Sequence, residues 1–259
     1  MEENNRNKSM LYRLIKAVVK VCYPKMEIVG TENLPEGEAI IVGNHTQMNG
    51  PIACELYLPG IHYTWCAGQM MELKEVPGYA YEDFWSGKPR SVRWLYKILS
   101  YLIAPLSVCV FNNANTIGVY HDNRILTTFK KTVQKLQDGA RVVIFPEHDA
   151  PYNHILCQFQ DKFIDVAKLY YKRTKRDISF VPLYIAPALH KMYLGKPITY
   201  CAANPPEEER RRICSYLMKE ITGIACALPE HRVVPYNNIP KKNYPSNIPG
   251  EETYEKTGG

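Results

Sequence analysis

The chain has 259 residues, of which 46% are hydrophobic and 22% charged, and its formal net charge is +6. This length is ample for a sizeable core within one α/β unit, and the composition excludes a wholly disordered chain. The basic excess either suits an anionic partner, such as a lipid head group, a phosphorylated cofactor or a nucleic acid, or serves solubility alone.

Eight cysteines are scattered along the chain, and no two of them stand as a CxxC pair. We therefore expect neither a zinc site nor a thioredoxin-like site. Most of these cysteines are expected to be buried apolar residues in a reducing cytosol. The polar start MEENNRNKSM predicts no signal peptide.

The first predicted element is a helix over Met10 to Tyr23, which stops before Pro24. Its apolar face is formed by Leu11, Leu14, Ile15, Val18, Val19 and Cys22, and its basic residues are Arg13, Lys16 and Lys20. Such a helix either packs on its own domain or lies in a membrane interface. If the rest of the chain acts on lipids, residues 1–25 form an N-terminal membrane-associating helix.

Short apolar runs then alternate with turns. They predict strands at Met26–Gly30, Ala39–Val42 and Tyr63–Cys66, with a short helix at Ile52–Leu58. The segment from Met70 to Arg93 is rich in glycine, proline and charge, which predicts a long loop with short helical pieces. A loop of this length in a compact domain is often functional or a lid.

The longest uncharged apolar run, Ile98 to Phe111, contains Pro105. Its 14 residues are too few to span a bilayer, because a membrane helix needs about 20. We predict a helix over Trp94–Ala104 and a strand over Val108–Phe111. The run is expected to be a buried core segment, with insertion at a membrane surface as the alternative.

Helices and strands continue to alternate in the second half of the chain. The predicted elements are Arg124–Gln137, Ile164–Tyr171 and Pro205–Cys226 as helices, and Arg141–Phe145 and Ile178–Ile185 as strands. The alternation predicts an α/β fold with a central mixed sheet flanked by helices. We assign residues 26–228 to this domain. Residues 229–259 form a proline-rich tail that is expected to be extended or disordered.

Ligands in such folds bind at the carboxyl ends of the strands. Asn44 and His45 follow one predicted strand, and residues 145–148 follow another. A neutral imidazole on a rigid strand end can accept a proton from a hydroxyl near pH 7. An acyl transfer also requires a donor for the developing oxyanion and cations for a phosphate on the acceptor.

Five segments stand in a recognisable order along the chain. They are GTENLPEGEAIIVGNH (30–45), VIFPEH (143–148), the residues Phe159, Phe163 and Ala167, ISFVPLYIAP (178–187) and LGKPI (194–198). In order and spacing, over about residues 26–200, they resemble the glycerol-3-phosphate/1-acylglycerol-3-phosphate (lysophosphatidate) acyltransferase family. Each motif is only moderately specific, and the ordered set is fairly specific.

The resemblance implies transfer of a fatty acyl group from acyl-CoA or acyl-carrier protein to a hydroxyl of a lysophospholipid-like acceptor. His45 would be the general base, and Glu147 and His148 would contact the acceptor. No metal, no further cofactor and no nucleic-acid partner are implied. The enzyme would lie at the cytoplasmic, inner face of the cell membrane, in contact with membrane lipids.

The chain departs from the family pattern just after this histidine. Gly50 stands where the family has the Asp that orients the imidazole, and loss of such an orienter can cost about four decades in rate. Asn49 is the candidate substitute, since an amide oxygen can hold a histidine tautomer. Glu147 or Asp149 could also reach His45 in space. If nothing replaces the Asp, the site is inactive.

A second departure affects recognition of the acceptor phosphate. His121 stands at the place of the family's arginine, and Arg124 follows three residues later. Arg124 either supplies the bidentate phosphate contact or lies in solvent at the start of a helix.

Two other functions remain open. The first is a catalytically inactive lipid- or acyl-carrier-binding protein on the same fold, which the altered motifs favour. The second is a hydrolase that pairs Cys54 or Cys66 with His45, although no nucleophile-elbow motif is present.

Overall fold

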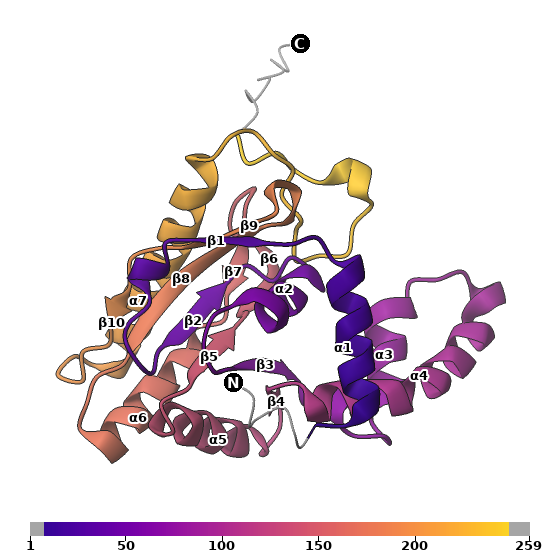
Figure 1. Ribbon diagram of the computed structural model, residues 1–259, viewed down its shortest axis with the longest axis horizontal. Helices are drawn as coiled ribbons and strands as arrows, with labels where there is room; N and C mark the ends of the chain where they lie inside the picture. The colour runs from indigo at the N-terminus through magenta and orange to yellow at the C-terminus, as the bar shows by residue number, and fades with distance from the viewer. Residues whose placement is uncertain (1–7, 249–259) are drawn as a thin grey trace, which may run out of the picture.

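The computed structural model describes residues 8–248, and its centre is an eight-stranded sheet (Figure 1). The strand order is β1-β9-β8-β2-β5-β3-β4, and β10 pairs with β8. The strands are β1 (Glu27–Val29), β2 (Ile40–Gly43), β3 (His62–Ala67), β4 (Thr116–Val119), β5 (Arg141–Ile144), β8 (Ser179–Ala186), β9 (Lys191–Leu194) and β10 (Ile198–Thr199). A separate hairpin joins β6 (Glu147–Pro151) and β7 (Cys157–Phe159).

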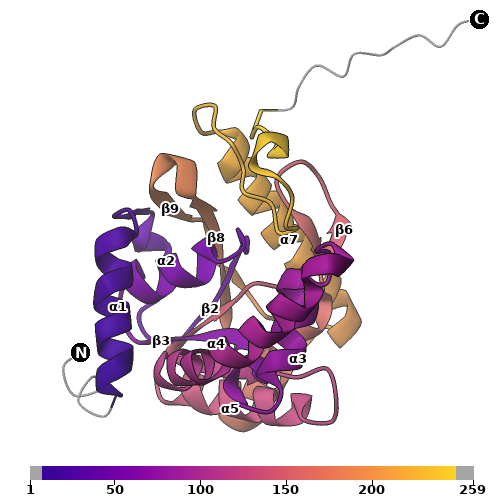
Figure 2. The same cartoon turned by 90° about the vertical axis from the view of Figure 1, so that its right-hand side faces the viewer.

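The five consecutive strands from β8 to β4 are parallel, whereas β9 and β10 pair with β8 in the antiparallel sense. The helices are α1 (Met10–Cys22), α2 (Asn49–Tyr57), α3 (Val76–Ala80), α4 (Arg93–Asn113), α5 (Ile125–Gln137), α6 (Asp165–Thr174) and α7 (Pro206–Cys226). The predicted α/β class, with a central mixed sheet flanked by helices, is confirmed (Figures 1 and 2).

The inner strands are apolar on both faces because helices cover both sides of the sheet. In β2, Ile40 and Val42 pack toward α5, α6 and α7, whereas Ile41 packs toward α2. The same alternation in β5 sends Val142 to the first layer and Val143 to the second. This two-sided burial explains why these strands read as continuous apolar runs.

The turn between β1 and β2 contacts the C-terminal end of β9. Gly30 has a φ of +83°, and a Cβ atom there would lie 2.3 Å from the carbonyl oxygen of Leu194. The Asn33 side chain donates to the same oxygen at 2.9 Å. Two of the motif segments, residues 30–45 and 194–198, therefore meet in the folded chain.

The strand predicted over Val108–Phe111 is wrong, because α4 is one continuous helix with Pro105 inside it. Its buried side carries Ser100, Ala104 and Ser107, which recur at helical spacing. Packing of these small side chains near α3 overrides the strand preference of the apolar run. The expectation of a buried core segment is also wrong, since most of the large side chains of α4 are exposed.

We call residues 76–113 the helical arm. It begins with α3, continues through a short helical turn at Tyr81–Trp85 and returns along α4. As predicted, the segment from Met70 to Arg93 consists of short helical pieces. The arm projects from the rest of the molecule (Figure 1).

The proline-rich segment was expected to be extended or disordered. Residues 229–248 are extended but fixed to the domain, and residues 249–259 lie outside the described part. The buried Asn247 accepts a hydrogen bond from the His231 N–H at 2.7 Å, and the His231 ring contacts the Tyr184 hydroxyl of β8 at 2.8 Å. Buried side chains join residues 229–248 to the sheet, and the domain boundary at residue 228 stays a prediction.

Candidate active site

His45 follows β2 at the carboxyl end of the parallel strands, and its neighbour Asn44 fixes it there. The buried Asn44 amide donates to the Ile185 carbonyl oxygen at 3.0 Å and accepts from the Ile185 N–H at 2.7 Å. The side chain thus continues the β2–β8 hydrogen bonding beyond Gly43, where the strand ends. The backbone of His45 is therefore held in a fixed position at the end of the sheet.

The turn after His45 has an unusual backbone. Thr46 and Gln47 have φ values of +48° and +55°, a conformation that costs a non-glycine residue about 1–3 kcal/mol. The Gln47 side chain donates to the Asn237 carbonyl oxygen at 3.3 Å and accepts from the Tyr244 hydroxyl at 3.4 Å. The C-terminal segment therefore helps to hold this strained turn.

The His45 ring lies half-buried between two aromatic rings. Phe145 and Tyr236 contact it edge to face, with centroid distances of 5.3 Å and 5.6 Å. Burial lowers the pKa of His45, although a backbone contact with Gln47 opposes the shift. The imidazole is therefore neutral near pH 7, the form that can accept a proton.

The Nδ1 atom of His45 is buried and has no hydrogen-bond partner among the described residues. Asn49, the predicted orienter, instead donates to the Thr46 carbonyl oxygen at 3.0 Å and accepts from the Tyr23 hydroxyl at 3.4 Å. The amide holds the turn together rather than the ring. The Asn49 amide makes no hydrogen bond to the His45 ring in this geometry, and its orienting role stays a prediction.

Glu147 does reach His45, but at the backbone. One carboxylate oxygen accepts from the His45 N–H at 2.7 Å, and the other accepts from the Cys157 N–H at 2.8 Å. Glu147 is buried, which raises its pKa to about 7 against the effect of these two donors. Glu147 thus joins the β6–β7 hairpin to the histidine turn as a positioning residue. Its contact with the acceptor stays a prediction.

Substitution of Glu147 by Gln is expected to lower the free energy of unfolding by about 1–3 kcal/mol, because an amide oxygen can serve only one of the two N–H donors well. The raised pKa means that the folded protein keeps a proton that the unfolded chain loses between pH 4.5 and 7. The stability of the wild type therefore falls through this window as the pH rises, and the variant lacks this component.

Urea unfolding of both proteins across this range is the measurement. The stability advantage of the wild type should shrink as the pH rises toward 7. An advantage that grows with pH would show that the folded state favours the ionised Glu147.

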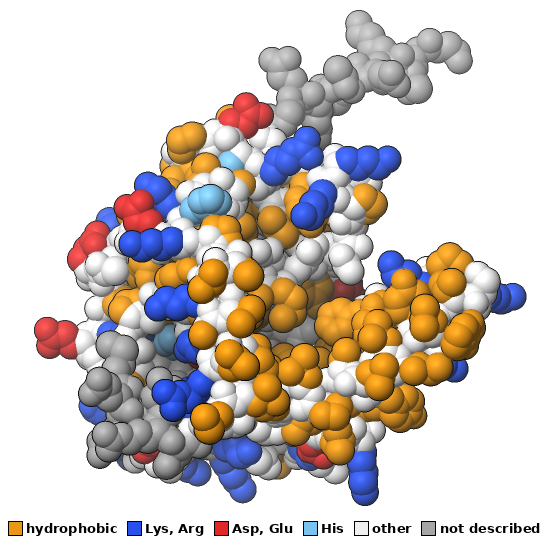
Figure 3. All heavy atoms as spheres, turned by 45° about the vertical axis from the view of Figure 1, so that its right-hand side comes forward, with side chains coloured by type: hydrophobic (Ala, Val, Ile, Leu, Met, Phe, Trp, Pro, Cys, Tyr) orange, Lys and Arg blue, Asp and Glu red, His pale blue; other side chains and the backbone are white. Residues whose placement is uncertain are grey.

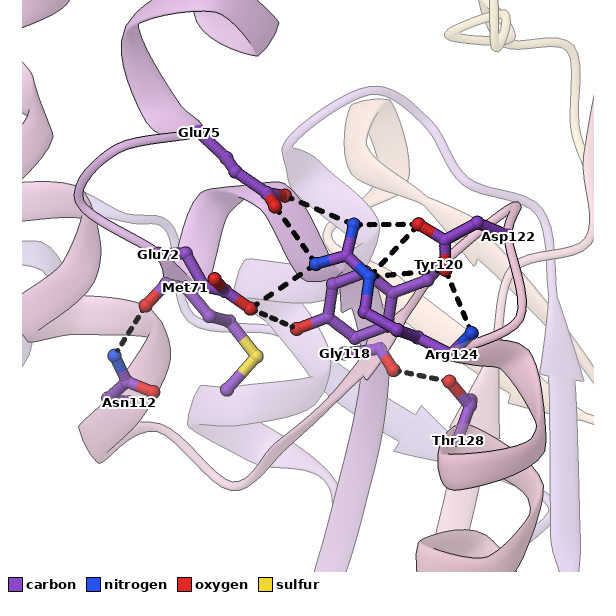
Figure 4. A network of polar contacts seen from close by, with 9 residues as sticks. All are labelled: Met71, Glu72, Glu75, Asn112, Gly118, Tyr120, Asp122, Arg124 and Thr128. Atoms are coloured by element: carbon purple, nitrogen blue, oxygen red, sulfur yellow. Dashed lines mark hydrogen bonds and ion pairs between the residues drawn. The ribbon is translucent and has the colours of Figure 1, made fainter.

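Arg124 is engaged by carboxylates and does not lie free for a phosphate (Figure 4). Its guanidinium contacts Asp122 at 2.8 Å, Glu75 at 2.9 Å and Glu72 at 3.4 Å, and it stacks on the Tyr120 ring at 3.9 Å. Three carboxylates already compensate the single positive charge. In this structure Arg124 links the end of β4 to the base of the helical arm. Its contact with an acceptor phosphate stays a prediction.

His121 and His148 are both exposed. His148 lies in β6, next to Glu147, on the hairpin that adjoins the site. His121 and Arg124 follow β4, which is three strands away from β2. At about 4.8 Å per strand, this separation is about 14 Å along the sheet edge. The structure thus brings Glu147 and His148 near His45 but leaves the other two apart.

Arg124→Ala is expected to loosen the helical arm without changing the KM for a phosphorylated acceptor, since the guanidinium holds Glu72 and Glu75. Hydrogen exchange should become faster over residues 72–80. Lys130→Ala, which removes an exposed cation from α5, is the matched control. A raised KM in Arg124→Ala alone would support the phosphate role.

Three segments converge around the histidine. Burial and the neighbouring Asp149 carboxylate raise the pKa of Asp83, which lies on the helical arm. Burial also raises the pKa of Tyr79 to about 12, with contributions from Asp83 and Tyr236. The Asn237 amide of the C-terminal segment donates to the Asp149 carbonyl oxygen of the β6–β7 hairpin at 3.4 Å, and Figure 3 shows the molecule hollowed beside the arm.

The two cysteines considered as nucleophiles are poorly suited to that role. Cys54 is fully buried, and burial raises its pKa. Burial raises the pKa of Cys66 to about 11. A thiol in such surroundings stays protonated near pH 7 and is a weak nucleophile. The hydrolase hypothesis therefore has no support from the described residues.

No family model matches the chain. No curated protein matches it either. Among solved structures, the chain is similar to the crystal structure of the 1-acyl-sn-glycerophosphate (LPA) acyltransferase PlsC from Thermotoga maritima. The two share 13% sequence identity with a TM-score of 0.46, over 82% of this chain and 79% of the other. The functional proposal therefore rests on the residues and geometry of this chain.

No role was assigned from the sequence to three residues of the site, which are Asn44, Phe145 and Tyr236. Asn44 was noted beside the histidine, and the signal for its role was a polar residue directly after a buried strand. Phe145 directly follows another such strand, β5. Tyr236 gave no signal, because it lies in a proline-rich segment that reaches the site only through long-range contacts.

Proposed function

We propose that this chain is an acyltransferase that moves a fatty acyl group from acyl-CoA or acyl-carrier protein to a hydroxyl of a lysophospholipid-like acceptor. The observation that supports it best is the assembly of the motif segments around His45. Asn44 bonds to Ile185 of β8, which lies in the segment 178–187. Glu147, which lies in the segment 143–148, bonds to the His45 backbone. Segments that are distant in sequence thus form one support for a neutral imidazole.

The proposed reaction uses the Nε2 atom of His45, since Nδ1 is enclosed. Nε2 takes the proton of the acceptor hydroxyl as the oxygen attacks the thioester carbonyl. The tetrahedral intermediate then expels the thiolate, which receives the proton from the imidazolium. The products are an ester and a free thiol, and the histidine returns to its neutral form.

The test is a transfer assay with purified protein. Palmitoyl-CoA and a palmitoyl-carrier protein are offered with glycerol 3-phosphate, with lysophosphatidate and with lysophospholipids that carry larger head groups. The free thiol and the new ester are both measured. Equal amounts of the two products would support the proposal, whereas thiol release without ester would indicate thioester hydrolysis.

A second candidate is a catalytically inactive protein that binds a lipid or an acyl carrier on the same fold. The unpartnered Nδ1 atom favours it, because nothing among the described side chains fixes the tautomer of His45. Saturable binding of a donor or an acceptor, with no product in any combination, would select this candidate.

The proposed location is the cytoplasmic, inner face of the cell membrane, with α1 in contact with lipid. Tyr12 and Lys16 hold α1 to the domain through Glu55 of α2, at 2.6 Å and 2.5 Å. The opposite side of α1 exposes Leu11, Leu14 and Val18. An exposed apolar stripe supports membrane contact over packing on the chain's own domain.

A further inference from the structure

The helical arm exposes an unusual amount of apolar surface. The side chains on the outer side of α4 that are about half exposed or more include Trp94, Leu95, Ile98, Tyr101, Leu102 and Leu106. Trp94 is 64% and Leu102 is 70% exposed. Scattered exposed apolar residues are ordinary, but a contiguous group of this kind marks an interaction surface.

The outward direction of these side chains follows from how α4 packs. Its small residues Ser100, Ala104 and Ser107 lie on the buried side, and the Ser107 hydroxyl donates to the Met70 carbonyl oxygen at 3.0 Å. Ala104 packs with Val76 and Ala80 in a small cluster of the arm. The large apolar side chains are thus left on the opposite face.

The exposed faces of α1 and α4 are neighbours. The Ser9 N–H, just before α1, donates to the Asn113 side chain at the end of α4 at 2.7 Å. Lys8 donates to Asn115 at 3.1 Å, directly after α4. Figure 3 shows hydrophobic side chains extending from the body along the projecting arm. We call the exposed apolar side chains of α1 and α4 the docking face.

The charges of the docking face indicate its partner. Neither α1 nor the segment 90–113 contains an Asp or a Glu residue, whereas both carry Lys and Arg. Exposed cations, among them Arg13, Lys20, Arg90 and Lys97, lie on the same two segments as the apolar residues. A second copy of the same basic surface would repel it. An anionic lipid surface supplies both the opposite charge and an apolar layer.

The helix at the centre of the docking face, α4, is long and apolar enough to span a bilayer by length and composition alone. By length and composition, Arg90–Asn113 is the one helix in the described part that could cross, with 24 residues and a mean hydropathy of 1.6. Its buried side, however, remains packed near α3, and Asn112 donates to the Met71 carbonyl oxygen at 2.9 Å. These contacts along one side of α4 favour a helix that lies in the interface over one that crosses the bilayer.

We propose that α1 and α4 together form a docking face for an anionic lipid bilayer, with α4 as its larger part. The apolar side chains enter the boundary between head groups and acyl chains, while the lysines and arginines contact lipid phosphates. Trp94 and Tyr101 suit the interface because each has an apolar ring with a polar group. The docking face would bring the proposed acyltransferase to its lipid acceptor, so this inference rests on the proposed function. Binding to vesicles, however, is measured without turnover.

The experiment is flotation of the full chain with vesicles of pure phosphatidylcholine and of equimolar phosphatidylcholine and phosphatidylglycerol. We expect binding to the anionic vesicles that weakens as salt is added. Leu95→Glu combined with Leu102→Glu should weaken it by more than about tenfold, because two exposed leucines lose their apolar contact. Leu126→Glu, an equally exposed leucine of α5, is the matched control and should bind like the wild type.

Three outcomes would overturn the proposal. They are wild-type protein that fails to float with anionic vesicles, a double variant that binds as tightly as the wild type, and a control variant that loses binding equally. If sedimentation shows a dimer that the double variant dissolves while vesicle binding is unchanged, the face belongs to a second copy instead. His45→Ala should float like the wild type, so absence of acyl transfer and absence of docking are separate results.

Discussion

Replacement of His45 by alanine is expected to lower the rate of acyl transfer by about 10²- to 10⁴-fold, the range that a positioned general base contributes. The ring is neutral near pH 7 because burial lowers its pKa, and its backbone is fixed by Asn44 and Glu147. The effect should fall on kcat rather than on binding. The substitution removes only the imidazole and leaves the backbone of the strained turn in place, so circular dichroism should show an unchanged fold.

The pH profile distinguishes a base from a structural histidine. Activity requires the neutral imidazole, so kcat/KM should be at its plateau above the ordinary histidine pKa of 6.5. It should fall only at a lower pH, where the ring gains a proton. His121→Ala is the matched control, since His121 is exposed and about three strands away, and it should match the wild type. Transfer that survives in His45→Ala would refute the proposed mechanism.

Substitution of Gly50 by Asp, the residue of the family pattern, is expected to destabilise the protein by about 3 kcal/mol and to leave activity no higher. A Cβ atom at position 50 would lie 2.4 Å from the His45 carbonyl oxygen and 3.1 Å from the Phe145 ring. The Gly50 N–H also donates to that same carbonyl at 3.2 Å. The turn must therefore shift before any side chain fits.

The measurement is urea unfolding together with the transfer assay. Gly223→Asp is the matched control, because a Cβ atom at this exposed helical glycine of α7 meets nothing within 4 Å. It should cost far less stability than Gly50→Asp. A stable Gly50→Asp variant with faster transfer would mean that the turn can adopt a second arrangement, in which the Asp does orient His45.

The local elements were predictable because they follow from patterns within a few residues. The apolar runs of β2, β5 and β8 are buried on both faces, which is what such runs indicate. The place of His45 at a strand end follows from the same reasoning. The helix predicted over Arg124–Gln137 is confirmed to within one residue as α5, since its helical period continues up to Gly139.

Local patterns did not show which partners the polar side chains of Asn49 and Arg124 have in the folded chain. Asn49 and Arg124 were assigned roles by their place in a pattern, but Thr46, Tyr23 and three carboxylates occupy their polar groups. The carboxylate of Glu75 lies 49 residues from Arg124 in sequence. No local pattern can show such a partner.

The amino-acid sequence by itself determined the α/β class, most of the helices and strands and the position of His45, because hydrophobic period and turn residues act locally. Only the tertiary structure decided which side chains surround that histidine, and that the apolar run of α4 faces outward. Those outcomes depend on which surfaces the folded domain buries. Ser100, Ala104 and Ser107 allow α4 to pack closely on one side, and its larger apolar side chains remain for a partner.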